Sequence, residues 1–131
     1  MADRAAAEDW FRRYRVAWES NDEGDIRGLF TDDAVYRGKP DDPEPYVGLE
    51  AIVAGWLDDA DQPGDTEFEW AVLAVDADVA IARCVTTYLN EEPPTTYDNL
   101  FVIRLAPGGR ATEFTDWWIP RRASGGPGDA A

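Results

Sequence analysis

Apolar residues recur at spacings of three and four near the start of the chain, which is the pattern of a helix with one buried face. In residues 3–19 this stripe consists of Trp10, Phe11, Tyr14 and Trp18, and it predicts a first helix. The Ser-Asn-Asp sequence that follows is typical of a helix end and of a new helix start.

Two further helices are expected, with a loop between them. A short one turns Ile26, Leu29 and Phe30 inward. Residues 31–47 are expected to be mostly loop, because a glycine and three prolines interrupt them. The third helix is expected from about residue 49 to 58.

The second half of the chain alternates apolar and polar residues with a period of two, which predicts strands. Strands are expected at residues 66–76, 79–89, 97–105 and 111–119, joined by short turns. Helices followed by consecutive strands predict an α+β fold with a curved antiparallel (mixed) sheet. Three N-terminal helices on one face would enclose a cone-shaped apolar pocket.

Composition narrows the classes of function. The 131 residues suit one domain, expected over residues 1–122, with a disordered tail at 123–131. The net charge of −15 argues against nucleic acid and membrane surfaces as partners. Cys84 is the single cysteine, and neither a signal segment nor a spanning apolar run is visible, so we expect a cytoplasmic protein.

The chain has no histidine. This excludes Ser-His-Asp and Cys-His nucleophile systems and removes the commonest ligand of zinc and haem sites. None of the acidic clusters has the spacing of a calcium loop. We therefore expect no metal and no cofactor, and any chemistry must use carboxylates, Arg, Tyr, Asn and water.

Asp116 and Arg83 are the candidate catalytic residues. Asp116 stands between Phe114 and Trp118 at alternate positions of the last strand, and Arg83 stands in a β-branched row of the strand at 79–89. Placed on inward faces, they would meet as a buried pair. An apolar setting raises the pKa of the carboxyl group and a nearby Arg lowers it, so the pair is either acid/base machinery or a structural ion pair.

Aromatic and polar side chains are expected to bind the ligand around this pair. They are Tyr14, Trp18, Tyr36, Trp56, Tyr97, Asn99, Phe101, Phe114 and Trp118. The opposite row of the 79–89 strand (Ala82, Cys84, Thr86 and Tyr88), with Thr115, Trp117 and Ile119, is expected to face outward and to pack against a second copy in a homodimer.

Two stretches carry a resemblance to a known family. They are Trp18–Asp22 with Leu29–Tyr36 and Gly48, and the closing strand Gly109–Trp118. Both resemble SnoaL-like proteins of the nuclear transport factor 2-like superfamily, which includes ketosteroid isomerases, polyketide cyclases and epoxide hydrolases. The resemblance implies the cone fold and covers most of residues 8–120.

Two enzyme patterns of that superfamily match in part. In a comparison with ketosteroid isomerase, Tyr14 stands at the position of the oxyanion-hole tyrosine. Gly38 and Phe101, however, stand at the positions of its two aspartates. Against limonene epoxide hydrolase, Asp116, Arg83 and Tyr36 match, but Val85 and Gly38 replace the second aspartate and the asparagine. In SnoaL-like cyclases a single pocket aspartate acts as acid/base, which Asp116 resembles.

Two hypotheses follow. In the first, a small hydrophobic molecule binds in the cone and Asp116 transfers a proton, as in a cyclase, isomerase or hydrolase. In the second, the chain is a non-catalytic ligand-binding or dimeric assembly domain in which Arg83 and Asp116 form a structural pair. The sequence leaves the choice between them open.

Overall fold

The computed structural model describes residues 3–121 except 59, 61 and 63. Its centre is a six-stranded mixed sheet in the order β2-β1-β6-β5-β4-β3. The strands are β1 (Phe30–Arg37), β2 (Tyr46–Val47), β3 (Thr66–Asp76), β4 (Val79–Tyr88), β5 (Thr95–Leu105) and β6 (Ala111–Pro120). The strands from β3 to β6 pair antiparallel in chain order, whereas β1 pairs parallel with β6. The predicted α+β fold is confirmed.

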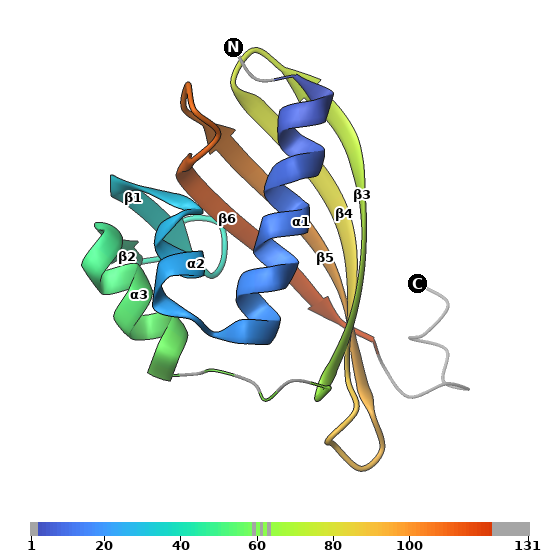
Figure 1. The fold of residues 1–131 in the computed structure, drawn as a ribbon. Coiled ribbons are helices and arrows are strands. Elements are labelled where there is room, and N and C mark those ends of the chain that lie inside the picture. The colour runs from blue at the N-terminus through green and yellow to red at the C-terminus, as the bar shows by residue number, and fades with distance from the viewer. Residues whose placement is uncertain (1–2, 59, 61, 63, 122–131) are drawn as a thin grey trace.

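Three helices cover one face of this sheet: α1 (Arg4–Ser20), α2 (Glu23–Arg27) and α3 (Leu49–Asp58). Figure 1 shows α1 running across the curved sheet, with α2 and α3 near the β1–β2 edge. Asp3 caps the start of α1 by accepting a hydrogen bond from the Ala6 amide at 2.8 Å. Asn21 ends α1 with a left-handed φ of 51°, and Asp22 caps α2, so the predicted stop and restart are confirmed.

The segment predicted to be mostly loop contains a strand. β1 pairs Phe30 with Ala111 and then Val35 with Glu113, so the four residues of β1 between these pairs lie opposite one residue of β6. The extra residues bulge outward and include the exposed Asp32 and Asp33. The expectation of a loop was wrong for two reasons: β1 pairs with β6, whose residues come 78 to 81 positions later, and the bulge removes the alternation that marks a strand.

The inward face of β4 is also the reverse of the one expected. Ala80, Ala82, Cys84 and Thr86 are buried, whereas Arg83 is exposed. The reason is the size of the side chains opposite. The small row lies beneath a core that includes Trp10 and Phe11 of α1, and Phe101 stands beside Ala82 on the neighbouring strand, so larger β-branched residues would overfill this space.

The core lies between α1 and the sheet. Trp10 is fully buried, and its indole Nε1 donates a hydrogen bond to the Leu29 carbonyl at 2.9 Å. Phe11 stacks on Phe101 with ring centroids 6.0 Å apart. Within the described residues, no helix has the length and apolarity needed to cross a membrane. The tail expected to be disordered lies outside the described residues.

Candidate acid/base site in an aromatic cavity

A cavity of about 420 Å³ lies between the helices and the sheet. Among the described residues, fourteen line it, and eight of these are aromatic. The helical side contributes Tyr14 and Trp18 from α1 and Trp56 from α3; the sheet contributes Asn99 from β5 and Asp116 from β6. This volume is in the range of sites that enclose small organic ligands.

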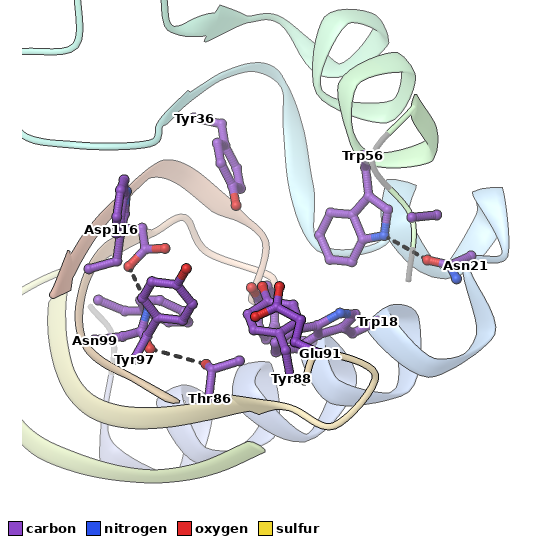
Figure 2. Close-up of a pocket in the computed structure, with 14 residues that line it drawn as sticks. Trp18, Asn21, Tyr36, Trp56, Thr86, Tyr88, Glu91, Tyr97, Asn99 and Asp116 are labelled. Carbon is purple, nitrogen blue, oxygen red and sulfur yellow. Dashed lines mark hydrogen bonds between the residues drawn. The ribbon is translucent and has the colours of Figure 1, made fainter. Parts of the chain in front are cut away.

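A chain of hydrogen bonds crosses the sheet wall of the cavity and ends on Asp116. The Thr86 hydroxyl donates to Asn99 Oδ1 at 3.0 Å, and Asn99 Nδ2 donates to Asp116 Oδ1 at 3.0 Å (Figure 2). Thr86 and Asn99 are 3% and 8% exposed, so the bond between them is shielded from bulk water, and the bond from Asn99 to Asp116 is partly buried. Because its oxygen accepts from Thr86, the Asn99 amide is oriented with its NH₂ group toward the carboxyl group.

The environment of Asp116 favours its neutral form. Burial raises the pKa of Asp116 to about 6, and the hydrogen bond from Asn99 partly opposes this by stabilising the carboxylate. No guanidinium or ammonium of the described chain contributes to this balance. Asp116 therefore changes its charge close to neutral pH, where a general acid or base works best.

Two phenols lie near this carboxyl group. Burial raises the pKa of Tyr14 and of Tyr36, and the negative charge of Asp116 adds to both effects. Tyr14 lies close enough to Tyr36 to oppose a small part of the rise in the pKa of Tyr36. Figure 2 shows the Tyr36 hydroxyl and the Asp116 carboxyl pointing into the same space. Both phenols stay protonated at neutral pH and can serve as hydrogen-bond donors.

Polar contacts hold two of the tryptophans that line the cavity. The Trp56 indole Nε1 donates to Asn21 Oδ1 at 3.2 Å, which ties α3 to the end of α1. The Trp118 indole Nε1 donates to the Gly38 carbonyl at 2.9 Å. Each hydrogen bond stabilises the orientation in which the ring lines the cavity.

Gly55 allows the Tyr46 ring to approach the backbone of α3 closely. A Cβ atom on Gly55 would lie 2.5 Å from Cζ of Tyr46, so the tyrosine ring lies directly over the backbone of the helix. Tyr46 in turn contacts Tyr36, with ring centroids 6.1 Å apart. The absence of a Cβ atom at Gly55 therefore lets the Tyr46 ring pack against α3, and Tyr46 in this position contacts Tyr36 of the cavity wall.

Most of the residues predicted to contact a ligand line the cavity. They are Tyr14, Trp18, Tyr36, Trp56, Tyr97, Asn99, Phe101 and Trp118, together with Asp116. Phe114 does not line it: this ring is fully buried and stacks behind Tyr36 with centroids 4.5 Å apart. The expectation for Phe114 was wrong. Alternation predicts which face of the strand a side chain lies on, but it does not predict whether that side chain reaches the cavity or is covered by other core residues.

The predicted pair of Arg83 with Asp116 does not form. Arg83 lies on the outer face of β4, its side chain is 63% exposed, and its Nη2 is 3.9 Å from Oδ1 of Asp98. Asp116 pairs in register with Phe101, whose neighbour on β4 is Ala82 of the inner row. Since Arg83 belongs to the other row, it neither enters the cavity nor affects the charge of Asp116.

Sequence reasoning missed five residues that line the cavity: Asn21, Ala60, Thr86, Tyr88 and Glu91. Thr86 and Tyr88 were missed because the inner face of β4 was reversed, and the run of small residues in their row was the available signal. Glu91 lies in the connection between β4 and β5, and no pattern in the sequence marked it. Among the described residues, no group of three or more His, Cys, Asp and Glu side chains is placed to hold a metal ion.

Comparison with protein families gives a match to the SnoaL-like domain over residues 11–114, which is well over half of the chain. The chain belongs to the SnoaL-like family. A comparison with curated proteins gave no match. The fold of this SnoaL-like chain, as the resemblance implied, is shared with proteins of the nuclear transport factor 2-like superfamily.

Three solved structures resemble this SnoaL-like chain. A ketosteroid isomerase-like protein from Erwinia carotovora atroseptica is 23% identical with a TM-score of 0.64, over 88% of this chain and 95% of that one. An epoxide hydrolase of M. tuberculosis, similar to limonene epoxide hydrolase, is 14% identical with a TM-score of 0.65, over 88% and 84%. An NTF-2-like protein of unknown function from Burkholderia xenovorans is 14% identical with a TM-score of 0.69, over 93% and 89%. At these identities the similarity establishes the fold alone.

Proposed function

We propose that this chain binds an apolar small molecule in the cavity and that Asp116 transfers a proton on it, in a reaction of the isomerase, cyclase or hydrolase type. The observation that carries this proposal is a desolvated carboxyl group, without a cationic partner among the described residues, on the wall of an aromatic cavity. Removing a carboxylate from water destabilises it, and an unpaired one in a cavity is a recurring sign of acid/base function.

The proposed step uses groups that the cavity already aligns. Above its pKa of about 6, the Asp116 carboxylate accepts a proton from the ligand or from a water beside it, while Asn99 holds the carboxylate in position. Negative charge then develops on a ligand oxygen, and the Tyr36 hydroxyl can donate to it with support from Tyr14. Asp116 afterwards returns the proton to another atom.

The comparisons agree with this class of chemistry without choosing within it. One similar structure is described as ketosteroid isomerase-like and another as an epoxide hydrolase. Ketosteroid isomerisation transfers a proton on an apolar molecule and develops negative charge on an oxygen atom. What this chain has in common with the two patterns is a carboxyl group and a phenol in one cavity.

A chromogenic base-catalysed reaction tests the proposal without knowledge of the natural substrate. In 5-nitrobenzisoxazole a base removes the C3 proton, the N–O bond breaks, and a coloured cyanophenolate forms. We expect the chain to accelerate this reaction with a rate that rises with pH around a midpoint near 6. Asp116→Asn should lower the rate at least about a hundredfold, which is the low end for a general base.

A matched control removes one carboxylate elsewhere. Asp76 is exposed at the end of β3 and does not line the cavity, so Asp76→Asn should leave the rate unchanged. No acceleration by the wild-type chain, or equal rates for the Asp116 and Asp76 variants, would contradict the assignment of Asp116 as the base.

We also propose a homodimer through the outer face of the sheet. Trp117 and Ile119 are 46% and 65% exposed on the outer face of β6, and Trp117 lies beside Leu100 of β5 in register. Large exposed apolar side chains on one sheet face favour packing against a second copy. Sedimentation analysis should give a dimer for the wild-type chain and a monomer for Trp117→Asp; a wild-type monomer would refute the proposal.

A further inference from the structure

The charged side chains that line the cavity, within the part of the chain that the structure describes, are all acidic. Among the described residues that line it, Asp116 and Glu91 carry carboxyl groups, and there is no Arg or Lys. The other lining residues are eight aromatic rings and small or amide side chains. An anionic ligand would meet two carboxylates and no cation in this space, so the wall selects against negative charge.

Aromatic rings add to the same preference. The face of a Trp or Tyr ring is electron-rich and attracts cations, most strongly when water is excluded. The chain contains its own example beside the cavity, where the Arg15 guanidinium lies over the Trp18 ring at 5.1 Å. Arg15 forms an ion pair with Glu19 and donates hydrogen bonds to Thr66, so its charge is already satisfied outside the cavity.

The two carboxylates occupy different settings. Asp116 lies on the sheet wall, half-buried and hydrogen-bonded to Asn99. Glu91 is exposed in the connection after β4, three residues beyond Tyr88. Figure 2 draws Glu91 with Tyr88 and Trp18 in a different part of the cavity from Asp116. One carboxylate can therefore hold a cation while the other remains free for proton transfer.

We propose that the molecule bound here is an organic amine or quaternary ammonium compound. Its cationic group lies beside Glu91 and the aromatic rings at that end, and its apolar body extends toward Asp116. This inference rests on the proposed function for the existence of a small-molecule ligand and adds the charge of that ligand. It goes beyond the acid/base proposal, which a neutral compound would satisfy equally well.

A pair of compounds that differ in charge alone provides the test. Trimethyl(4-hydroxyphenyl)ammonium and 4-tert-butylphenol have the same shape, because carbon replaces the charged nitrogen in the second. Binding of each to the full chain is measured by isothermal titration calorimetry in the same buffer at pH 6.5. We expect the cation to bind about tenfold more tightly than the neutral phenol.

Two isosteric variants separate a local effect from the attraction of an acidic protein for any cation. Glu91→Gln should weaken binding of the ammonium compound about threefold to tenfold and leave the neutral phenol unchanged. Asp76→Asn removes the same charge from an exposed position outside the cavity and should change neither affinity. Both substitutions are at exposed positions, so the fold should be retained.

The inference is overturned if the neutral phenol binds as tightly as the ammonium compound or more tightly, or if the ammonium compound does not bind. It is also overturned if the Glu91 and Asp76 variants weaken binding of the cation equally. Each of these results leaves the acid/base proposal standing when the Asp116-dependent elimination is observed. Conversely, preferential binding of the cation without that elimination would support a binding site and contradict the proton transfer.

Discussion

Replacing Asp116 by asparagine should make the folded chain more stable at neutral pH. The pKa of Asp116 is about 6 in the folded chain, because burial destabilises the charged form, and the ordinary value is 3.8. Each pKa unit corresponds to about 1.4 kcal/mol, so the ionised carboxylate costs the fold about 2 to 3 kcal/mol. Asparagine has nearly the same shape and carries no charge, and its oxygen can still accept the hydrogen bond from Asn99.

The sign of this effect depends on pH. The folded chain binds the Asp116 proton more tightly than the unfolded chain does, so protonation of this group stabilises the fold. That contribution is complete below about pH 4, is lost as the pH rises from about 4 to 6, and is absent above 6. The difference in unfolding free energy between Asp116→Asn and the wild-type chain should therefore grow with pH over that range.

Urea denaturation followed by tryptophan fluorescence, at pH values from 4 to 8, measures this difference. We expect a value below about 1 kcal/mol at pH 4 and a gain of about 2 to 3 kcal/mol for Asp116→Asn above pH 7. Asp76→Asn is the control, since an exposed carboxylate should give a small, flat difference. A flat profile for Asp116→Asn, or a variant less stable than the wild-type chain at pH 7, would refute the reasoning.

Two further substitutions test the packing and the electrostatics around the cavity. Gly55→Ala should destabilise the chain by about 1 to 3 kcal/mol in urea denaturation, because the added Cβ would lie 2.5 Å from the Tyr46 ring. This clash should outweigh the higher helix propensity of alanine. Equal or higher stability of the variant would show that the ring moves aside freely. Arg83→Ala should leave the pKa of Asp116, followed by its carboxyl signal in NMR, at about 6; a shifted midpoint would place the guanidinium within reach of the cavity.

Local patterns were enough to predict the helices and four of the strands. The apolar stripe of α1 and the alternation from Thr66 onward are properties of short segments, and the structure keeps both. β1 could not be predicted in the same way. Its partner β6 lies at the other end of the chain, and the bulge around Asp32 and Asp33 removes the period of two.

The inner face of β4 shows a second limit of pattern reasoning. Alternation divides the strand into two rows but does not say which row faces the core, and the more β-branched row was the natural choice. The choice reverses when the opposite layer is filled by large rings, because the volume left for the strand then admits only Ala82, Cys84 and their small neighbours. That volume is a tertiary property, set by residues far away in the sequence.

This reversal decides the chemistry available to the cavity. An arginine facing Asp116 would have lowered the pKa of the carboxyl group and made it a permanent counter-ion. With Arg83 outside and paired with Asp98, burial acts on Asp116 with only a neutral amide to oppose it. The carboxyl group consequently titrates close to neutral pH, and its ionised form lowers the stability of the fold. A side chain that destabilises its own fold in this way is characteristic of a functional site, and the stability measurements on Asp116→Asn therefore also bear on whether the cavity is catalytic.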